Sequence, residues 1–167
     1  AMSAFRYVSH KIVRGATKPD GLPGVRVADE TLIVTLKDEC SGLKVDLHYI
    51  VADDSDVLTR YLVVRNDGDD AVTLERAYSF CLDLPDTGEF YATRLAGDWA
   101  SERTPVTTPV ENGTIRIEST RGYSSHQMNP FLMLRTVDCT ETSGECYCFA
   151  LLYSGSFALA AERGSTR

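Results

Sequence analysis

Apolar and polar side chains alternate along most of this chain, which is the pattern of β-strands that bury one face. In LKVDLHYIV, every second side chain from Leu43 to Tyr49 is apolar, and the side chains between them are polar. Segments of this kind are rich in Val, Leu, Ile, Thr and Tyr, which favour extended backbone. The predicted strands are Thr31–Lys37, Leu43–Val51, Val57–Arg65, Ala71–Leu82, Glu89–Leu95, Thr114–Glu118, Phe131–Thr136 and Cys146–Tyr153.

Turn-forming residues separate these segments. Gly, Pro, Asp, Asn and Ser gather at residues 18–24, 38–42, 53–56, 66–70, 83–88 and 140–145. The run NDGDD at 66–70 lies between two predicted strands and predicts a hairpin. No segment keeps a helical period over three turns. The expected fold class is therefore all-β, an antiparallel sandwich, with residues 1–167 forming a single domain.

Composition excludes several classes of function. The 167 residues contain 24 acidic and 17 basic side chains, for a net charge of −7 and a pI near 4.9. A nucleic-acid partner needs clustered Lys and Arg, and no basic stripe occurs. No apolar run of 18 residues is present, so a membrane partner is not expected either.

The five cysteines indicate a reducing setting. They are odd in number and lack the paired CxxC spacing of a zinc site. Cys146 and Cys148 fall on one face of a predicted strand, so small buried thiols are expected rather than metal ligands. These features predict no metal, no cofactor and a cytoplasmic location.

Two acidic segments imitate catalytic or metal sites. Asp46 belongs to the alternating strand LKVDLHYIV and is expected to face solvent. Asp53 to Asp56 lie between two predicted strands, where Asp and Ser form turns, with calcium binding as a minor alternative.

The candidate binding residues lie in GDWASER, which begins at Gly97, and in RGYSSHQMNPF, which begins at Arg121. Trp99 is the only tryptophan. It offers either a flat face for a sugar ring or a plug for one end of the sandwich. His126 and Asn129 carry donors and acceptors for a polar ligand, although a histidine beside serines also bonds loop carbonyls. His10 and His48 are expected to be ordinary strand residues.

The chain resembles the amino-terminal domain of the family 36 glycoside hydrolases, which are α-galactosidases. The resemblance covers nearly the whole sequence, in this order: FRYVSHKI, GLPGVRV, ETLIVTLKD, GLKVDLHYIV, DVLTRYLVVRNDGDDAVTLERAYSFCLDLPD, GDWASER, IESTRGYSSHQMNPF and YSGSFAL. It implies a β-supersandwich of the galactose-mutarotase type. It also favours a substrate-facing role for Trp99, although Ser101 stands where the family usually has arginine.

The resemblance implies that this chain is a truncated part of a larger enzyme. The parent would hydrolyse terminal α-galactosyl residues of melibiose- or raffinose-type oligosaccharides with retention of configuration. Its two catalytic aspartates would lie in a (β/α)8 barrel that is absent here, so this fragment alone is expected to be inactive, with no catalytic residue in the chain. The expected partners are the substrate, the barrel of the same chain and further copies in a tetramer.

Two other functions remain open from the sequence. A stand-alone carbohydrate-binding module would need only an exposed Trp99 and other aromatic side chains on one face. A purely structural assembly domain would instead bury Trp99, and substitutions in its loops would change stability rather than binding.

Overall fold

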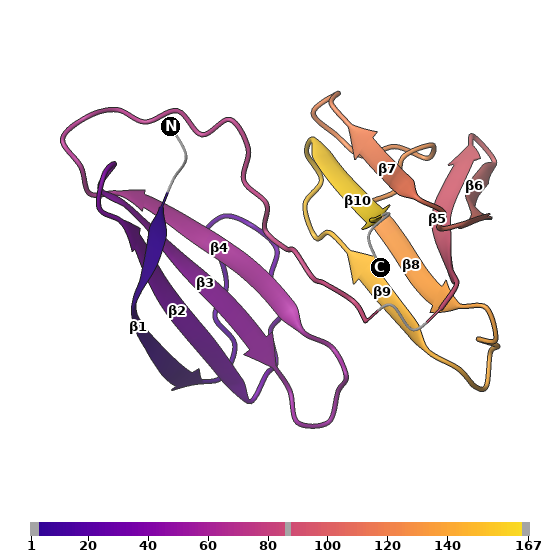
Figure 1. The fold of residues 1–167 in the computed structure, drawn as a ribbon, viewed down its shortest axis with the longest axis horizontal. Coiled ribbons are helices and arrows are strands. Elements are labelled where there is room, and N and C mark those ends of the chain that lie inside the picture. The colour runs from indigo at the N-terminus through magenta and orange to yellow at the C-terminus, as the bar shows by residue number, and fades with distance from the viewer. Residues whose placement is uncertain (1–3, 86–87, 165–167) are drawn as a thin grey trace. The chain divides into compact units, whose positions relative to one another are not determined.

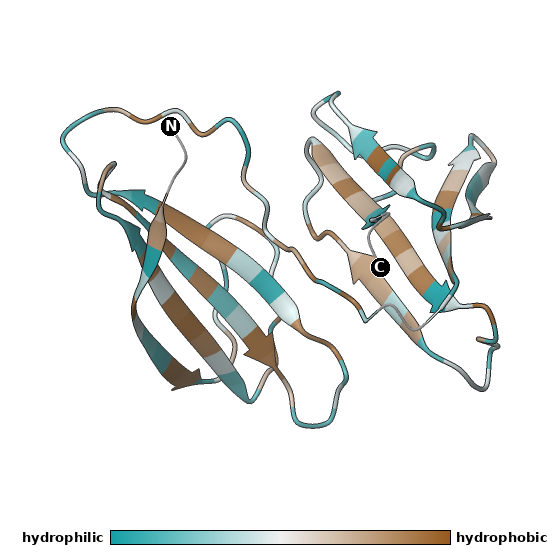
Figure 2. Ribbon diagram, in the orientation of Figure 1, coloured by the Kyte–Doolittle hydropathy of each residue, from teal (hydrophilic) through white to brown (hydrophobic). Residues whose placement is uncertain are grey.

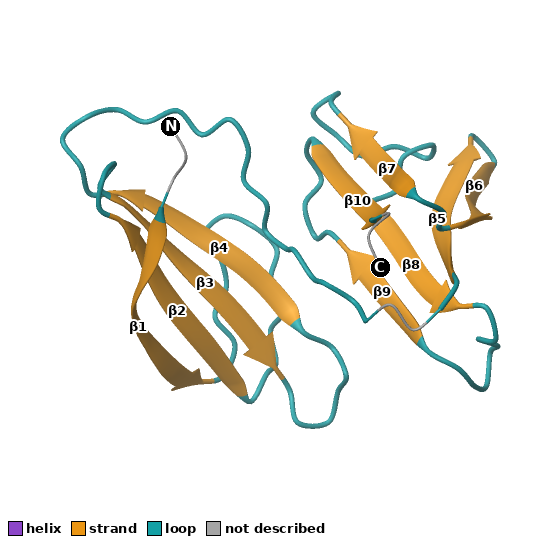
Figure 3. Cartoon of the chain, viewed as in Figure 1, coloured by secondary structure: helices purple, strands orange, loops and turns teal. Residues whose placement is uncertain are grey.

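The computed structural model describes residues 4–85 and 88–164, and these residues form antiparallel β-strands joined by loops (Figure 1). Figure 3 shows the same residues without a helix. The strands are β1 (Phe5–Arg14), β2 (Glu30–Asp38), β3 (Leu43–Val51), β4 (Thr59–Asn66), β5 (Phe90–Asp98), β6 (Ser101–Pro109), β7 (Gly113–Ser119), β8 (Phe131–Thr136), β9 (Cys146–Ala150) and β10 (Phe157–Arg163). The predicted all-β antiparallel class is confirmed, and its supersandwich arrangement stays a prediction.

The strands belong to two compact units, one ending at Asp83 and the other beginning at Leu84. The first unit is a four-stranded sheet in the order β1-β2-β3-β4. The second unit contains a four-stranded sheet in the order β6-β5-β8-β9 and a two-stranded ribbon of β10 and β7. Every pairing in these sheets is antiparallel. The candidate loops Gly97–Arg103 and Arg121–Phe131 both belong to the second unit.

The predicted strand Ala71–Leu82 is wrong, because this segment has no strand pairing. The hairpin predicted at residues 66–70 is therefore also wrong. The Asn66 amide closes a local turn by accepting from the Gly68 N–H at 3.1 Å and donating to the Asp70 carbonyl at 2.8 Å. The Asp67 N–H donates instead to the Gly42 carbonyl, in the turn between β2 and β3. The turn at residues 66–70 is thus bonded to the turn between β2 and β3. It does not lead into a strand that pairs with β4.

Other predicted strands match β2, β3, β5, β7 and β8, while β9 occupies only the first part of the strand predicted at Cys146–Tyr153. Strand β4 begins two residues later than expected, at Thr59. The sequence pattern missed β6 and β10, and it placed only His10 on what is now β1. Strand β6 contains Pro105 and Pro109, which lack an N–H for the ladder. Because β6 lies at the edge of its sheet, one side of its backbone needs no partner, and proline is tolerated there. The expected turn at 83–88 lies partly outside the described residues.

The prediction that Asp46 faces solvent is wrong. Asp46 is 8% exposed on β3, and it accepts a hydrogen bond from the Thr35 hydroxyl at 2.8 Å. Its other oxygen lies 2.7 Å from the Arg65 guanidinium. These two partners, on neighbouring strands, satisfy the charge that burial would otherwise make costly.

His48 shares the buried face with Asp46 and is a structural strand residue, as predicted. Its Nδ1 lies 2.9 Å from the Thr17 hydroxyl, and its ring stacks on Tyr61 with centroids 4.2 Å apart. The Thr31 hydroxyl donates to the Gly15 carbonyl and accepts from the Thr17 N–H. The segment before β2 is therefore bonded to Thr31 and His48 on this face of the sheet.

The opposite face of the first sheet carries the apolar side chains that the alternation predicted for the core. Leu47 on β3 lies between Val34 of β2 and Leu62 of β4, and all three are only partly buried. Figure 2 shows brown apolar bands across these neighbouring strands. The period of two was correct, but both faces contain buried residues: Leu43 is buried on the apolar face, and Asp46 and His48 are buried on the other.

The second unit has a hydrophobic core. Its buried residues come from strands β5, β7, β8 and β10 and from the residue after β6: Ala92, Ile117, Leu132, Phe157, Ala161 and Val110. Partly buried Phe90, Ile115, Leu134, Leu151 and Leu159 pack against them. This core holds the sheet and the ribbon together and so fixes the ends of β5, β7 and β8, from which the candidate loops extend.

The five cysteines are free thiols. Cys146 and Cys148 are exposed, so the prediction of buried thiols on this strand is wrong. These two cysteines are on β9, which is the edge strand of its sheet. None of the core residues named above comes from β9. Within residues 4–85 and 88–164, no group of three or more His, Cys, Asp or Glu side chains could hold a metal ion.

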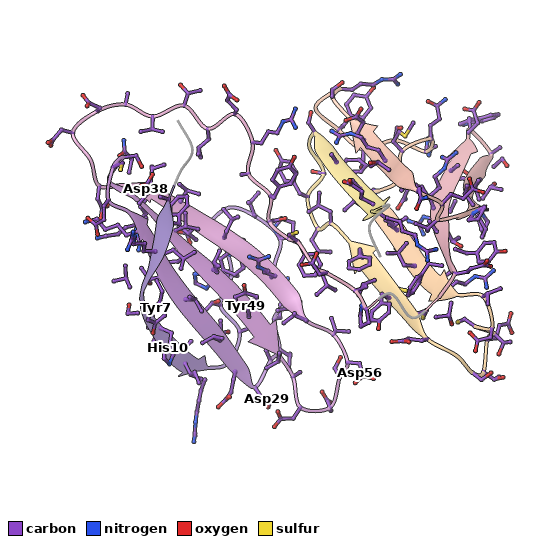
Figure 4. The ribbon with its side chains drawn as sticks, in the orientation of Figure 1. Tyr7, His10, Asp29, Asp38, Tyr49 and Asp56 are labelled. Atoms are coloured by element: carbon purple, nitrogen blue, oxygen red, sulfur yellow. The ribbon has the colours of Figure 1, made fainter. Side chains whose placement is uncertain are left out.

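The acidic segment Asp53–Asp56 forms a turn, as predicted. The Asp53 N–H donates to the Asp29 carboxylate at 2.7 Å, and the Ser55 N–H donates to the Ala52 carbonyl. Figure 4 labels Asp29 and Asp56 at this end of the first unit. It also labels Tyr7 and His10 on β1, where the Tyr7 hydroxyl lies 2.6 Å from Nδ1 of His10.

No helix among the described residues is long and apolar enough to cross a membrane.

Candidate functional site

Trp99 lies at the tip of the β5–β6 hairpin. Asp98 pairs with Ser101, so Trp99 and Ala100 form the turn between the strands. The Asp98 carboxylate accepts from the Trp99 N–H at 2.8 Å, and the Glu102 carboxylate accepts from the Ala100 N–H at 3.2 Å. The turn therefore satisfies its own backbone donors, and the Trp99 side chain stays 84% exposed.

A β-bulge follows this turn. Ala96 pairs with Thr104 and Asp98 with Ser101, so Gly97 alone stands opposite both Glu102 and Arg103. Arg103 has a positive φ of 59°, which is uncommon for any residue except glycine. A Cβ on Gly97 would lie 2.2 Å from the Ser101 carbonyl oxygen, so only glycine fits this close approach. Bulges of this kind change the direction of side chains at the end of a strand.

The loop from Arg121 to Pro130 connects β7 to β8 and is fixed by hydrogen bonds. The Ser119 hydroxyl donates to the Tyr123 carbonyl at 2.6 Å. The Gly122 N–H donates to the Ser156 hydroxyl, and Ser125 and Met128 exchange backbone hydrogen bonds. The ordered backbone gives the side chains between Tyr123 and Asn129 defined positions.

The bulge and this loop together form a hollow of about 530 Å³. Its volume lies within the range that small-molecule sites have in proteins. The residues that line it, which we call the hairpin hollow, are Glu102, Arg103, Tyr123, Ser124, Ser125, His126 and Asn129. Two loops far apart in the sequence thus contribute to one site.

Charged groups in the hairpin hollow are close but solvated. Oε1 of Glu102 lies 4.0 Å from Nδ1 of His126, with side chains 42% and 58% exposed. A polar contact this exposed contributes little to stability. Within the described part of the chain, the side chains of Arg103, Tyr123 and Asn129 have no hydrogen-bond or ion-pair partner. Their donors and acceptors are therefore available to a ligand.

The predicted site residues divide into two groups. His126 and Asn129 both line the hairpin hollow, whereas Trp99 is exposed at the hairpin tip and is not among the lining residues. Their role in binding stays a prediction. The sequence reasoning did not select Glu102, Arg103 and Tyr123, although all three lie inside the two motifs. A bulge is not visible in a period-of-two pattern, so the pattern gave no reason to place Glu102 and Arg103 in the same hollow.

A second, smaller hollow of about 140 Å³ lies beside the loop. It is lined by Glu118, Ser119, Thr120, Arg121, Ser125, Gln127 and Met128. It shares Ser125 with the hairpin hollow. Its volume is below the range of small-molecule sites, so the hairpin hollow is the candidate for a ligand.

Comparison with known proteins places the whole chain in one family. The family described as "Glycosyl hydrolase family 36 N-terminal domain" matches residues 1–167. The bifunctional alpha-galactosidase/sucrose kinase AgaSK of Mediterraneibacter gnavus is 41% identical over 161 residues, which are 94% of this chain and 17% of that protein. Alpha-galactosidase Mel36A of Lactobacillus acidophilus is 42% identical over 94% of this chain and 22% of its own length. The chain therefore spans about a fifth of the relatives it matches.

Solved structures agree with this assignment. The family 36 alpha-galactosidase AgaA of Geobacillus stearothermophilus matches with a TM-score of 0.92 and 35% identity, over 98% of this chain and 23% of that one. Variants of AgaA have been solved in complex with raffinose and with stachyose. With the family matched from the first residue to the last and the same fold in the solved relatives, this chain belongs to the glycoside hydrolase family 36 amino-terminal domains.

Proposed function

We propose that this chain is the accessory amino-terminal domain of an α-galactosidase and that its hairpin hollow forms part of the approach to the substrate. The single observation that carries the proposal is the hollow itself. It joins the two family-like motifs and presents Arg103, Tyr123 and Asn129, whose side chains have no partner in the described chain. Polar groups of this kind, beside an aromatic ring, suit a polyhydroxylated ligand.

The reaction that the whole protein would catalyse is hydrolysis of a terminal α-galactoside with retention. One carboxylate attacks the anomeric carbon, while a second protonates the leaving oxygen and then activates water. Among the described residues that line the hairpin hollow, Glu102 is the only carboxylate. A site with one carboxylate lacks the pair that this reaction needs, which supports catalytic aspartates outside these 167 residues.

Substrate identity is carried over from the relatives. AgaA, of which variants bind raffinose and stachyose, is 35% identical to this chain in the aligned domain. We propose raffinose-type oligosaccharides as the substrates of the protein to which this domain belongs, oligomer contacts as a second role of the domain, and the cytoplasm as its location. The five free thiols fit a reducing compartment.

A stand-alone sugar-binding module is the second candidate, and the exposure of Trp99 favours it. A flat aromatic face in solvent can stack on a sugar without help from a barrel. The same exposure argues against a purely structural domain, which requires a buried Trp99.

The test is hydrolysis of a chromogenic α-galactoside and of raffinose by this chain and by the full-length protein. The proposal expects an active full-length protein and an inactive chain. Activity of the chain alone would place the catalytic residues here and refute the accessory role. An inactive chain that binds raffinose as tightly as the full-length protein would support the stand-alone module.

A further inference from the structure

Three of the free thiols lie at one end of the β8–β9 hairpin. Cys146 and Cys148 both belong to β9, the edge strand of its sheet, and both are exposed. They are two residues apart on a strand, so their side chains point to the same face of the sheet. Cys139 lies in the loop that joins β8 to β9. None of the three lines the hairpin hollow, so they form a separate feature of the second unit.

The loop brings Cys139 close to the start of β9. A Cβ added to Gly144 would lie 2.5 Å from the Cα of Cys139, so the two backbones are in contact. The Cys139 carbonyl accepts from the Arg135 guanidinium at 3.3 Å, and Arg135 is the cross-strand partner of Cys146. Directly paired residues share a face of a sheet, so Arg135 and Cys146 lie on the same face. We call Cys139, Cys146 and Cys148 the thiol cluster.

Two side chains of the thiol cluster act directly on each other. Partial burial raises the pKa of the Cys148 thiol, and the charge of Cys146 and a hydrogen bond with Cys146 raise it further. Cys139 acts in the same direction, more weakly. A first thiolate in the cluster therefore disfavours a second, and Cys148 is the thiol that stays protonated. Cys146 is left to attack first, with Cys148 beside it.

Geometry makes Cys146 and Cys148 the pair that can be joined. A strand advances about 3.3 Å per residue, so their Cα atoms are about 6.6 Å apart, within the range of roughly 4.4–6.8 Å found for disulfides. Their sulfurs must still approach, which requires β9 to bend. An edge strand has no ladder on its outer side, so β9 has fewer hydrogen bonds to lose than a central strand.

We propose that the thiol cluster is a site of reversible oxidation by small disulfides such as oxidised glutathione, with an internal disulfide between Cys146 and Cys148 as the product. The Cys146 thiolate attacks one sulfur of the small disulfide, forms a mixed disulfide and releases a small thiolate. The Cys148 thiolate then attacks the Cys146 sulfur, forms the internal disulfide and releases the second small thiolate. The two protein thiols are oxidised, the small disulfide is reduced to two thiols, and the two protons pass to them. Because β9 must bend, the product is strained and easily reduced.

The test treats this chain with oxidised glutathione, blocks the remaining thiols with iodoacetamide and measures masses before and after digestion on the carboxyl side of glutamate. Such digestion separates Cys139 from the other two thiols, because Glu141 and Glu145 lie between them. We expect the peptide that contains Cys146 and Cys148 to lose two hydrogens, and dithiothreitol to restore both thiols. A thiol cluster that stays fully reduced, or a disulfide that joins Cys139 to β9, would overturn the proposal.

Three variants separate the two steps. Cys148→Ser should stop at the mixed disulfide and gain the mass of one glutathione at Cys146, whereas Cys146→Ser should form neither product in the cluster. Cys81→Ser removes an exposed thiol of the first unit and is the matched control, which should form the internal disulfide as the wild type does. Mixed disulfides spread equally over all exposed thiols, with no internal disulfide on β9, would contradict a built site.

Discussion

The Glu102 carboxylate lies 4.0 Å from the His126 imidazole, Oε1 to Nδ1, although Glu102 lies on strand β6 and His126 lies in the loop between β7 and β8. The same Oε1 accepts from the Ala100 N–H in the hairpin turn. Glu102 therefore links the turn that carries Trp99 to the loop that carries His126 and Asn129. Because both side chains are exposed, the contact between Glu102 and His126 adds little to the stability of the fold. It does bring the two side chains together at the hairpin hollow.

Replacing Trp99 by alanine should change function and not stability. Its side chain is 84% exposed, so we expect the free energy of unfolding of the chain to change by less than about 0.5 kcal/mol. In the full-length protein, kcat/KM for raffinose should fall. Val27→Ala, at an equally exposed position in the first unit, is the control and should alter neither quantity. A clear drop in the thermal midpoint of the Trp99 variant would mean that the ring packs as a plug.

Replacing Gly97 by alanine should destabilise the chain and distort the hairpin hollow. The new Cβ would meet the Ser101 carbonyl oxygen at 2.2 Å, and φ at this position is 146°. We expect a loss of about 1–3 kcal/mol in urea unfolding. Gly113→Ala is the matched control, because Gly113 also has a positive φ, 129°, but a Cβ added there would meet no atom within 4 Å. Equal losses in the two variants would show that backbone strain alone acts at Gly97 and that the close contact relaxes.

The fold class could be predicted from the sequence because strands follow from a local pattern. Strands β3 and β8 match their predicted bounds, Leu43–Val51 and Phe131–Thr136. The segment Ala71–Leu82 has the same local pattern, but no other strand of the described chain pairs with it. A period of two shows which side chains share a face; it does not show whether a neighbouring strand is present to pair with. Pairing depends on residues distant in sequence, so this error could not be avoided from local signals.

Removing the Asp46 carboxylate should be costly. Asp46 is buried, bonds to Thr35 and pairs with Arg65 at 2.7 Å. We expect Asp46→Ala to lower the free energy of unfolding by about 1–3 kcal/mol, since the part-buried Thr35 hydroxyl loses its acceptor and the ion pair with the more exposed Arg65 is lost. Glu39→Ala removes the exposed partner of Lys37 and should cost less than about 0.5 kcal/mol. Similar small effects for both variants in urea unfolding would contradict the buried pair.

Stability should fall in mild acid because of His48. Burial lowers the pKa of His48, as do the charges of Lys11 and Arg65, while the Asp46 charge opposes this shift. The unfolded chain then binds the proton more tightly than the folded chain, so stability rises with pH across this window. The contribution is complete above a pH of about 6.5, the ordinary histidine pKa, and decreases as the pH falls towards the folded-state pKa.

Urea unfolding at pH 7.5 and pH 5.5 measures this effect. His48→Gln does not titrate, so it should show a smaller difference between the two pH values than the wild type. An equal difference in both proteins would assign the acid sensitivity to other groups.

The candidate site could be predicted only in part. His126 and Asn129 stood out because polar side chains on a loop suit a ligand, and both line the hollow. Arg103 did not stand out, because its position depends on the bulge opposite Gly97 and on the fold that brings the β7–β8 loop beside it. Asp46 shows the opposite error, since partners on the two neighbouring strands, Thr35 and Arg65, satisfy a carboxylate that alternation assigned to solvent.

The most direct measurement is a crystal structure of the full-length protein with a bound raffinose-type oligosaccharide, using a variant that cannot complete hydrolysis. The account predicts sugar hydroxyls within hydrogen-bond distance of Arg103 and of His126 or Asn129, and catalytic carboxylates outside residues 1–167. An oligosaccharide bound far from the hairpin hollow, or a hollow filled by other parts of the protein, would contradict it.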